Sequence, residues 1–477
     1  MSTLWTMSAM AAAMHAERQG ALPDNVAGIS IDSRTLTPDE AYFAIRGDVH
    51  DGHDFVSAAL DKGAAVAVVA KSYRQNFLAD ARLLVVDNVL EALVDLAKAS
   101  RARLGGKVIA VTGSVGKTST KEALRAVLGA QGETHASAAS FNNHWGVPLS
   151  LARCPASAHY AIFEIGMNHA GEIEPLVKMV RPHVAIVTTV EPVHLEFFSG
   201  VEEIADAKAE IFTGLEPGGA AVLNIDNAQF ARLKQRAEEV GVSRVVSFGV
   251  NAKADARLID VSLHPTCSAV HASILGDDVT YKIAVPGKHI AMNSLAVLAA
   301  SSLTGADLAL SALALAQIKP ATGRGVRENL TVASGAAALI DESYNANPAS
   351  MAAALTVLGQ AKIGSRGRRI AVLGDMLELG PSGPALHRGL ADAIAANRID
   401  AVFCCGPLMR HLWEALPSAQ KGGYADDSAA LESQVVSALG AGDVIMIKGS
   451  LGSRMKLIVT SLQKHFPGKA ALDDVVV

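Results

Sequence analysis

The 477-residue sequence predicts an α/β fold with a central doubly wound sheet, a small N-terminal α/β domain and a C-terminal Rossmann-like domain. The length alone favours about three domains. Short aliphatic strands alternate with amphipathic helices, and the runs at 160–167, 184–190 and 220–226 have the nearly continuous apolar character of strands buried on both faces of a parallel sheet. In such sheets ligands bind beyond the carboxyl ends of the strands, so the residues that follow each strand are the candidates for function.

The composition excludes several classes of function. Lys plus Arg number 42 against 47 Asp plus Glu, and no basic block suits a nucleic-acid backbone, so we expect no nucleic-acid partner. No stretch reaches the ~18 apolar residues of a membrane span. Residues 1–20 are typical of an amphipathic helix rather than a signal peptide. The four cysteines lack a metal-ligand spacing and fit free thiols in a reducing compartment. We therefore expect a soluble, cytoplasmic protein, which we take to be a monomer.

The N-terminal part predicts a small domain over residues 1–104. After the first helix, residues 28–43 contain two short extended pieces, and a polar loop follows at 46–55. A helix is predicted at Val56–Lys62, with strands at Ala64–Ala70 and Arg82–Val86. A further helix runs into a linker near Gly105, which is a natural hinge.

The segment Val111 to Thr120, VTGSVGKTST, predicts a phosphate cradle at the start of a central domain over residues 105–322. Glycines let backbone N–H groups approach phosphate oxygens, and the helix that begins at Thr118 adds positive potential. Lys117 adds a mobile cation, and the hydroxyl of Thr118 or Ser119 can reach a phosphate-bound Mg²⁺. Val111 replaces the first glycine of the general P-loop pattern, so an ordinary glycine turn is the alternative.

Polar side chains follow two later strands of the predicted central sheet. A carboxylate and an imidazole beside a phosphate cradle could ligate Mg²⁺ or orient a substrate, although a plain polar loop is the alternative. The helix predicted at 202–212 carries Lys208, which by itself would be an ordinary solvated charge. The residues that follow the two strands are Glu164, Asn168 and His169, and Glu191, His194 and Glu196.

The last third of the sequence predicts a second domain, over residues 323–477, that resembles a nucleotide-binding fold but has no phosphate loop of its own. A long alanine-rich helical region at 291–316 precedes it, and the segment at 319–330, with Gly323, is typical of a linker and hinge. Buried strands are expected within 336–348, 368–376, 400–406 and 443–450, and helices at 384–397 and 429–439.

Nine collinear segments spread over nearly the whole chain resemble those of the Mur ligases, the ATP-dependent amide-forming enzymes of peptidoglycan precursor synthesis. The resemblance implies that residues 1–104 bind the UDP end of the substrate, 105–322 bind ATP, and 323–477 close over ATP and the incoming substrate. The segments are IDSRTLTPDEAYFAIRG with DGHDF, TGSVGKTSTKE, NNHWGVPLSL, EIGMNHAGEI, HLEFF with AKAEIF, GKHIAMNSLAV, IDESYNANPASM, AVLGDMLELG with a following His387, and IKGS.

The same resemblance implies roles for individual residues. Lys208 matches the family lysine that CO₂ carbamylates, and a carbamate could support a second Mg²⁺ where a bare lysine would repel it. His289 and Asn293 match the adenine side of the ATP site, although Ile290 replaces the usual Asn after the histidine. Arg324 matches an arginine that reaches the ATP phosphates. The remaining assignments are Gly113, Ser114, Val115, Gly116, Lys117, Thr118 and Ser119 on the ATP phosphates; Thr118, Glu164 and His194 on magnesium; Ser33 and Arg34 near UDP; Asp341 on the ATP ribose; and Asn142, Asn143, Tyr344, Asn345, Asn347 and Lys448 along the substrate cleft.

Within the family, the segment ESYNANPASM and the absence of a DNPR segment favour the members that add a dipeptide. The implied reaction joins D-alanyl-D-alanine to UDP-N-acetylmuramoyl-tripeptide through an acyl phosphate formed from ATP. A sister ligase that adds one amino acid and a folylpolyglutamate synthase are the nearest alternatives, since they share the phosphate loop and the central fold. An ATP-switched regulator or scaffold is an alternative of another class, and a P-loop kinase is a more distant one.

Overall fold

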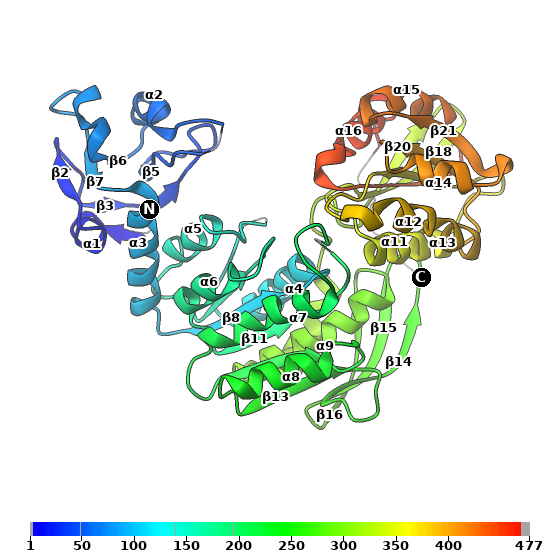
Figure 1. The fold of residues 1–477 in the computed structure, drawn as a ribbon, viewed down its shortest axis with the longest axis horizontal. Coiled ribbons are helices and arrows are strands. Elements are labelled where there is room, and N and C mark those ends of the chain that lie inside the picture. The colour runs from blue at the N-terminus through cyan, green and yellow to red at the C-terminus, as the bar shows by residue number, and fades with distance from the viewer. Residues whose placement is uncertain (1–2, 48, 139, 194, 469–477) are drawn as a thin grey trace.

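The computed structural model describes residues 3–47, 49–138, 140–193 and 195–468, and the predicted fold class is confirmed. Three large sheets form three domains (Figure 1), with the N-terminal and C-terminal domains on either side of a larger central one. A two-stranded sheet in the N-terminal domain pairs Trp5–Thr6 with Asn25–Val26. The five-stranded sheet lies within residues 17–86, the nine-stranded sheet within 107–283 and the six-stranded sheet within 326–448. Over the described residues, no helix is both long and apolar enough to cross a membrane.

The N-terminal sheet has the strand order β2-β7-β6-β5-β4, in which only β2 runs antiparallel to its neighbour. The helix predicted over residues 1–20 is wrong in length, because His15 takes a left-handed φ of 51° and the chain then enters a strand. The elements are β1 (Trp5–Thr6), α1 (Met7–Ala13), β2 (Glu17–Gln19), β3 (Asn25–Val26), β4 (Gly28–Ser30), β5 (Glu40–Phe43), α2 (Val56–Asp61), β6 (Val66–Ala70), β7 (Leu83–Val86) and α3 (Val89–Arg103).

The central sheet has the order β16-β15-β14-β13-β12-β11-β8-β10-β9, and β8 to β14 pair in parallel. Strand β8 lies between β10 and β11, so the strands that follow it in the sequence lie first on one side of it (β9 and β10) and then on the other (β11 and β12). Ligands bind at such a switch point. The strands are β8 (Lys107–Thr112), β9 (Thr134–Ala136), β10 (Tyr160–Glu164), β11 (Val184–Val187), β12 (Ala220–Asn224), β13 (Arg244–Gly249), β14 (Ala256–Leu263), β15 (Ser268–Ile274) and β16 (Asp277–Ile283).

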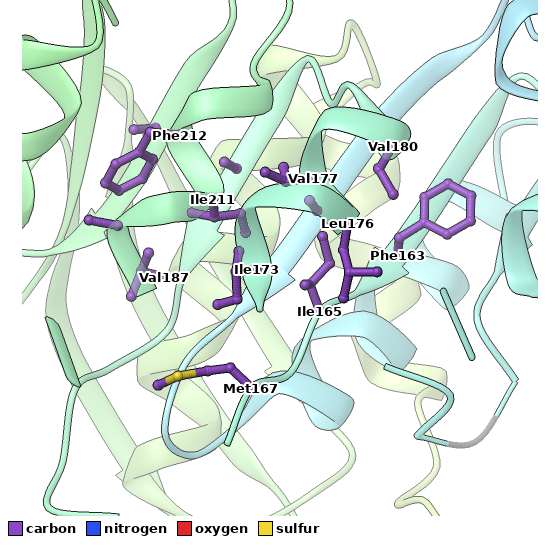
Figure 2. Close-up of a cluster of buried hydrophobic side chains, with 14 of the residues drawn as sticks. Phe163, Ile165, Met167, Ile173, Leu176, Val177, Val180, Val187, Ile211 and Phe212 are labelled. Atoms are coloured by element: carbon purple, nitrogen blue, oxygen red, sulfur yellow. The ribbon is translucent and has the colours of Figure 1, made fainter. Parts of the chain in front are cut away.

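Both faces of this sheet are buried, because successive side chains of a strand point to opposite faces. In β8, Val108 and Ala110 join one apolar cluster while Ile109 and Val111 join another. Figure 2 shows the first cluster, where Ile173, Leu176 and Val177 lie near Phe163 and Ile165. The helices are α4 (Lys117–Gly129), α5 (Gly146–Ala152), α6 (Ile173–Val180), α7 (Val201–Ala209), α8 (Phe230–Glu239), α9 (Lys288–Leu303) and α10 (Leu308–Ala314).

Two features of the central domain differ from the prediction. The helical region at 291–316 is two helices, α9 and α10, because Gly305 turns the chain with a left-handed φ of 87°. The antiparallel strands β14 to β16 extend the parallel sheet at one edge, and no prediction covered them.

The C-terminal sheet has the order β17-β18-β22-β19-β20-β21, parallel except for β17. The linker predicted at 319–330 is shorter, since β17 begins at Val326, and the helix predicted at 384–397 is two helices that meet at Gly389. The elements are β17 (Val326–Val332), β18 (Gly335–Glu342), α11 (Pro348–Gln360), β19 (Arg369–Gly374), α12 (Gly383–Arg388), α13 (Leu390–Ala396), β20 (Ala401–Cys405), α14 (Arg410–Ala415), β21 (Lys421–Ala425), α15 (Ser428–Ala438), β22 (Val444–Lys448) and α16 (Lys456–His465).

The N-terminal domain is fastened to the central domain across the predicted hinge at Gly105. The indole N–H of Trp5 donates to the carbonyl of Ala152 at 2.9 Å, and Arg153 Nε donates to the carbonyl of Ile29 at 2.7 Å. The Arg103 guanidinium, which lies 3.4 Å from the centre of the Trp5 ring, donates across the hinge to the carbonyl of Cys154 at 3.3 Å. These buried and half-buried contacts oppose bending at Gly105.

Candidate active site

A cleft of about 660 Å³ lies between the central and C-terminal domains. One wall is made by the phosphate loop, the carboxyl end of β10, the loop after β11 and the start of α9. The opposite wall is made by the start of β17, the end of β18, α11 and the loops after β19 and β22. The cleft therefore joins the carboxyl ends of strands from two sheets.

The phosphate loop has the backbone of an anion cradle. Gly113 and Gly116 have left-handed φ values of 146° and 88°, and Gly116 caps the N-terminus of α4. A Cβ on Gly113 would lie 1.9 Å from Thr188 Oγ1, so no side chain fits there. Ser114 Oγ donates to the carbonyl of Glu191 at 3.1 Å and accepts from its N–H at 2.9 Å. The loop is thus held open by β11 and the residues after it.

Two cations face each other across the cleft from different domains. Lys117 Nζ donates to the carbonyl of Gly113 at 2.7 Å, inside its own loop. Burial lowers the pKa of Lys117, Arg324 lowers it further, and Glu164 opposes both effects. The Arg324 guanidinium lies 4.4 Å from the centre of the Tyr344 ring. Among the described residues neither cation has an ion-pair partner, so both can take up the negative charge of a phosphate chain.

Glu164 ends β10 directly beside the phosphate loop and is 1% exposed. Its Oε2 accepts from Thr118 Oγ1 at 2.9 Å, and its Oε1 accepts from Asn142 Nδ2 at 2.8 Å. A hydroxyl and a carboxylate at this distance fit Mg²⁺, which is usually held by one or two protein oxygens together with substrate phosphates and water. The described residues contain no cluster of three or more His, Cys, Asp or Glu that could hold a metal alone. His194 lies outside the described residues.

Lys208 lies in α7 and is 2% exposed, contrary to the solvated charge that a helix lysine would usually be. Burial lowers its pKa well below the ordinary lysine value, and the charge of Lys117 adds to the effect. No hydrogen bond or ion pair joins its amine to another described residue. A neutral, desolvated amine is a nucleophile, which is the form that reacts with CO₂.

Most of the other predicted residues of the central and C-terminal domains meet in the cleft. His289 and Asn293 line it at the start of α9, and a Cβ on Gly116 would lie 2.5 Å from Asn293 Nδ2. Lys448 lines it too, 4% exposed, with its Nζ 3.2 Å from Glu342 Oε2. Others that line it are Ser114, Val115, Ser119, Asn142, Asn168, Glu191, Tyr344, Asn345 and Asn347.

Three of the residues predicted to contact the substrate have other surroundings. Asn143 Oδ1 accepts from the N–H of Gly146 at 2.9 Å, which caps the start of α5. Ser33 and Arg34 lie in the turn after β4 in the N-terminal domain, outside the cleft. The Arg34 side chain is 87% exposed and pairs with Asp32 at 2.7 Å.

Asp341 is not among the cleft residues, but its neighbour Glu342 is. Asp341 accepts from the hydroxyl of Ser343 at 2.6 Å and pairs with Lys456 at 2.8 Å, so both its oxygens are occupied. Because side chains alternate along β18, Glu342 points to the opposite face, into the cleft. The prediction missed Glu342 and also Arg327, which lines the cleft from β17. Alternation along the strand was the signal that could have found Glu342.

Comparison with known proteins gives a consistent family. Family models match residues 25–101 ("Mur ligase family, catalytic domain"), 111–301 ("Mur ligase middle domain") and 329–451 ("Mur ligase, glutamate ligase domain"). The UDP-N-acetylmuramoyl-tripeptide–D-alanyl-D-alanine ligase of Escherichia coli (strain K12) is 33% identical, over 96% of this chain and 98% of the relative. The enzyme of the same name from Bacillus subtilis (strain 168) is also 33% identical, over 91% and 93%.

Solved structures agree with the sequence relatives. A crystal structure of MurF from Acinetobacter baumannii has a TM-score of 0.81 and 28% identity, over 96% of this chain and 99% of that one. The MurF ligase from Thermotoga maritima, solved in complex with ADP, has a TM-score of 0.74 and 25% identity, over 92% and 97%. The chain therefore belongs to the Mur ligase family.

Proposed function

We propose that this enzyme is the ATP-dependent ligase that joins D-alanyl-D-alanine to UDP-N-acetylmuramoyl-tripeptide, giving the UDP-linked pentapeptide precursor of peptidoglycan. The single observation that carries the proposal is the cleft in which Lys117 and Arg324 approach from two domains without an ion-pair partner among the described residues. The relatives named above supply the substrates, and the ADP complex of one of them supports ATP as the phosphoryl donor.

The reaction begins with transfer of the γ-phosphoryl group of ATP to the terminal carboxylate of the tripeptide. A carboxylate is a poor electrophile, and the resulting acyl phosphate supplies a good leaving group. The amine of D-alanyl-D-alanine then attacks the acyl carbon, and phosphate departs. The protein contributes positioning and charge neutralisation: the loop from Gly113 to Ser119 holds the phosphates, while Lys117 and Arg324 offset the negative charge on the transferred group.

Magnesium would supply Lewis-acid polarisation of the phosphoryl oxygens, held by the Thr118 hydroxyl and the Glu164 carboxylate, with His194 as a further ligand. Lys208 is proposed to carry a carbamate, because the lowered pKa of its buried amine favours the unprotonated form that reacts with CO₂. His289, Asn293 and Glu342 are assigned to the nucleoside side of ATP. Asp341 is then assigned an indirect role in the nucleotide site: it accepts hydrogen bonds from the N–H and the hydroxyl of Ser343, and this fixes the turn that carries Tyr344.

The three domains divide the work at the boundaries 1–104, 105–322 and 323–477. We assign the first to the uridine diphosphate end of the substrate, with Ser33 and Arg34 nearby, and the last to closure over the dipeptide, with Asn142, Asn345, Asn347 and Lys448 along the cleft. Gly323 and Gly325, with left-handed φ values of 71° and 93°, are the proposed hinge, because contacts already brace Gly105. Closure excludes water, which would hydrolyse an acyl phosphate. We place the enzyme in the cytoplasm as a monomer.

The test is phosphate release from ATP and Mg²⁺ with the UDP-linked tripeptide, with and without D-alanyl-D-alanine, with the acceptor followed by mass. Release that requires both substrates and an acceptor that gains one dipeptide are expected. Turnover with a single amino acid would instead indicate a sister ligase. ATP binding without turnover in any combination would favour the regulator.

A further inference from the structure

Lys121 is a fully buried lysine in α4, one turn beyond Lys117, and its side chain is 0% exposed. Helical spacing puts it on the same face as Leu124 and Leu128, where an apolar residue would ordinarily fill the core. A lysine is almost never fully buried unless its charge is paired. Its presence at a core position therefore needs an explanation from its surroundings.

The amine of Lys121 connects three elements behind the phosphate loop. Its Nζ donates to the carbonyl of Ser137 at 2.7 Å, in the segment that follows β9. The same Nζ lies 3.1 Å from Glu122 Oε1 and 3.9 Å from Glu164 Oε2. Ser137 Oγ in turn accepts from the N–H of Glu164 at 3.4 Å. Lys121 thus supports Glu164 directly through charge and indirectly through Ser137.

The pairing with Glu122 does not by itself account for a buried lysine at this position. Glu122 is 24% exposed and already pairs with Arg125 at 2.7 Å on the outer side of the helix. Glu164, by contrast, is 1% exposed, and its two hydrogen bonds from Thr118 and Asn142 come from neutral groups. Among the described residues, the cation that lies within 4.0 Å of the Glu164 carboxylate is Lys121, whose Nζ is 3.9 Å from Glu164 Oε2.

We infer that Lys121 is a positioning residue for the magnesium nucleotide: it holds the Glu164 carboxylate in one orientation at the edge of the phosphate loop. The inference rests on the proposed function through the assignment of Glu164 to magnesium. Lys121 itself is fully buried and is not among the residues that line the cleft. Removing such an outer partner of a metal ligand typically costs 10- to 100-fold in metal affinity.

The experiment measures binding of a non-hydrolysable ATP analogue to the full chain as Mg²⁺ is varied, together with the unfolding temperature. The variants are K121Q, which keeps a donor for the Ser137 carbonyl, and K121M, which keeps the apolar stem. E122Q is the matched control, because it removes the charge of the carboxylate nearest to the Lys121 amine, at 3.1 Å, without changing Glu164. E164Q reports what loss of the carboxylate itself does.

We expect K121Q and K121M to raise the Mg²⁺ concentration at half-saturation by about 10- to 100-fold, with analogue binding in the absence of Mg²⁺ unchanged within about threefold. E122Q should lower the unfolding temperature and leave the Mg²⁺ midpoint within about twofold of the unsubstituted protein, as expected for a charge that serves stability alone. A midpoint that moves less than twofold in the folded Lys121 variant, or equally in E122Q, would overturn the inference. An unchanged Mg²⁺ midpoint in E164Q would overturn the inference too, together with the assignment of Glu164 to magnesium. Because this binding measurement needs no turnover, its result does not depend on which peptide the enzyme ligates.

Discussion

Gly113→Ala tests whether the phosphate loop works through its backbone shape. The φ of Gly113 is 146°, a conformation that residues with a side chain rarely adopt, and forcing it costs about 1–3 kcal/mol. The new Cβ would lie 1.9 Å from Thr188 Oγ1 and 3.1 Å from Thr188 N. Thr188 Oγ1 donates to the carbonyl of Val115 at 2.5 Å, so relieving the clash also sacrifices a hydrogen bond worth about 1 kcal/mol.

The two costs amount to about 2–4 kcal/mol if the loop must be restored to its present shape to bind phosphate. Since about 1.4 kcal/mol is tenfold in affinity, G113A should weaken nucleotide binding by about 30-fold to several hundred-fold. Gly116→Ala should cost less, because its Cβ meets the end of a flexible side chain, Asn293, at 2.5 Å. Gly129→Ala is the matched control, since it ends the same helix and its Cβ meets nothing within 4 Å.

Calorimetry with an ATP analogue checks the order G113A, G116A, G129A from weakest to tightest binding. Thermal unfolding without nucleotide separates a loop effect from a general loss of stability, and G129A should gain about 0.4–1 kcal/mol in stability. Binding by G113A within about threefold of the unsubstituted protein would refute the argument. It would mean that the phosphates are held by side chains rather than by the backbone N–H groups.

Three further predictions concern Lys208, Asp51 and the order of substrate binding. Lys208→Ala should lose ligase activity, and acetate but not chloride should restore part of it, because only a carboxylate can replace a carbamate; an unaffected variant would end the carbamate proposal. In the N-terminal domain, burial alone would raise the pKa of Asp51, but hydrogen bonds from Tyr73 and His53 outweigh it and lower the pKa to about 2. Relative to the ordinary value of 3.8 this contributes about 2 kcal/mol at pH 7, which is lost progressively as the pH falls from about 5 to about 1. Urea unfolding should therefore show D51N less stable at pH 7, with a difference that shrinks as the pH falls through 2. D-alanyl-D-alanine should bind the free enzyme far more weakly than the enzyme loaded with ATP analogue and UDP-linked tripeptide, and equal affinities in calorimetry would contradict this order of addition.

The parts of the fold that the sequence predicts are those with a local cause. The phosphate loop is recognisable because Gly113 and Gly116 answer a backbone requirement within a few residues. The buried parallel strands are recognisable because both faces are apolar. The break at Gly305 depends on how α9 and α10 pack, and an alanine-rich sequence hides it. Buried and half-buried residues alternate along β15, which is the pattern typical of a strand. The sequence therefore contains a local signal for β15, although the prediction did not include this strand.

The candidate site follows the same division. Residues of the phosphate loop could be assigned from spacing, whereas the choice between Asp341 and Glu342 depends on which face of β18 meets the cleft. Spacing puts Lys121 on the buried face of its helix, but which charges lie near Lys121 and Lys208 depends on residues outside those helices. These long-range properties decide the chemistry, since they set which amine has a lowered pKa and which is paired with carboxylates.

The charges in the cleft supply a physical reason for ATP to bind before the domains close. Arg324, on the C-terminal side, already lowers the pKa of Lys117 on the central side, so the two cations repel each other at their present separation. Closing the cleft would bring them nearer and remove water, which strengthens the repulsion. A triphosphate between them reverses the sign of this interaction. Closure should then follow nucleotide binding. The amine of the dipeptide should therefore enter a site that already excludes water and in which the acyl phosphate can form.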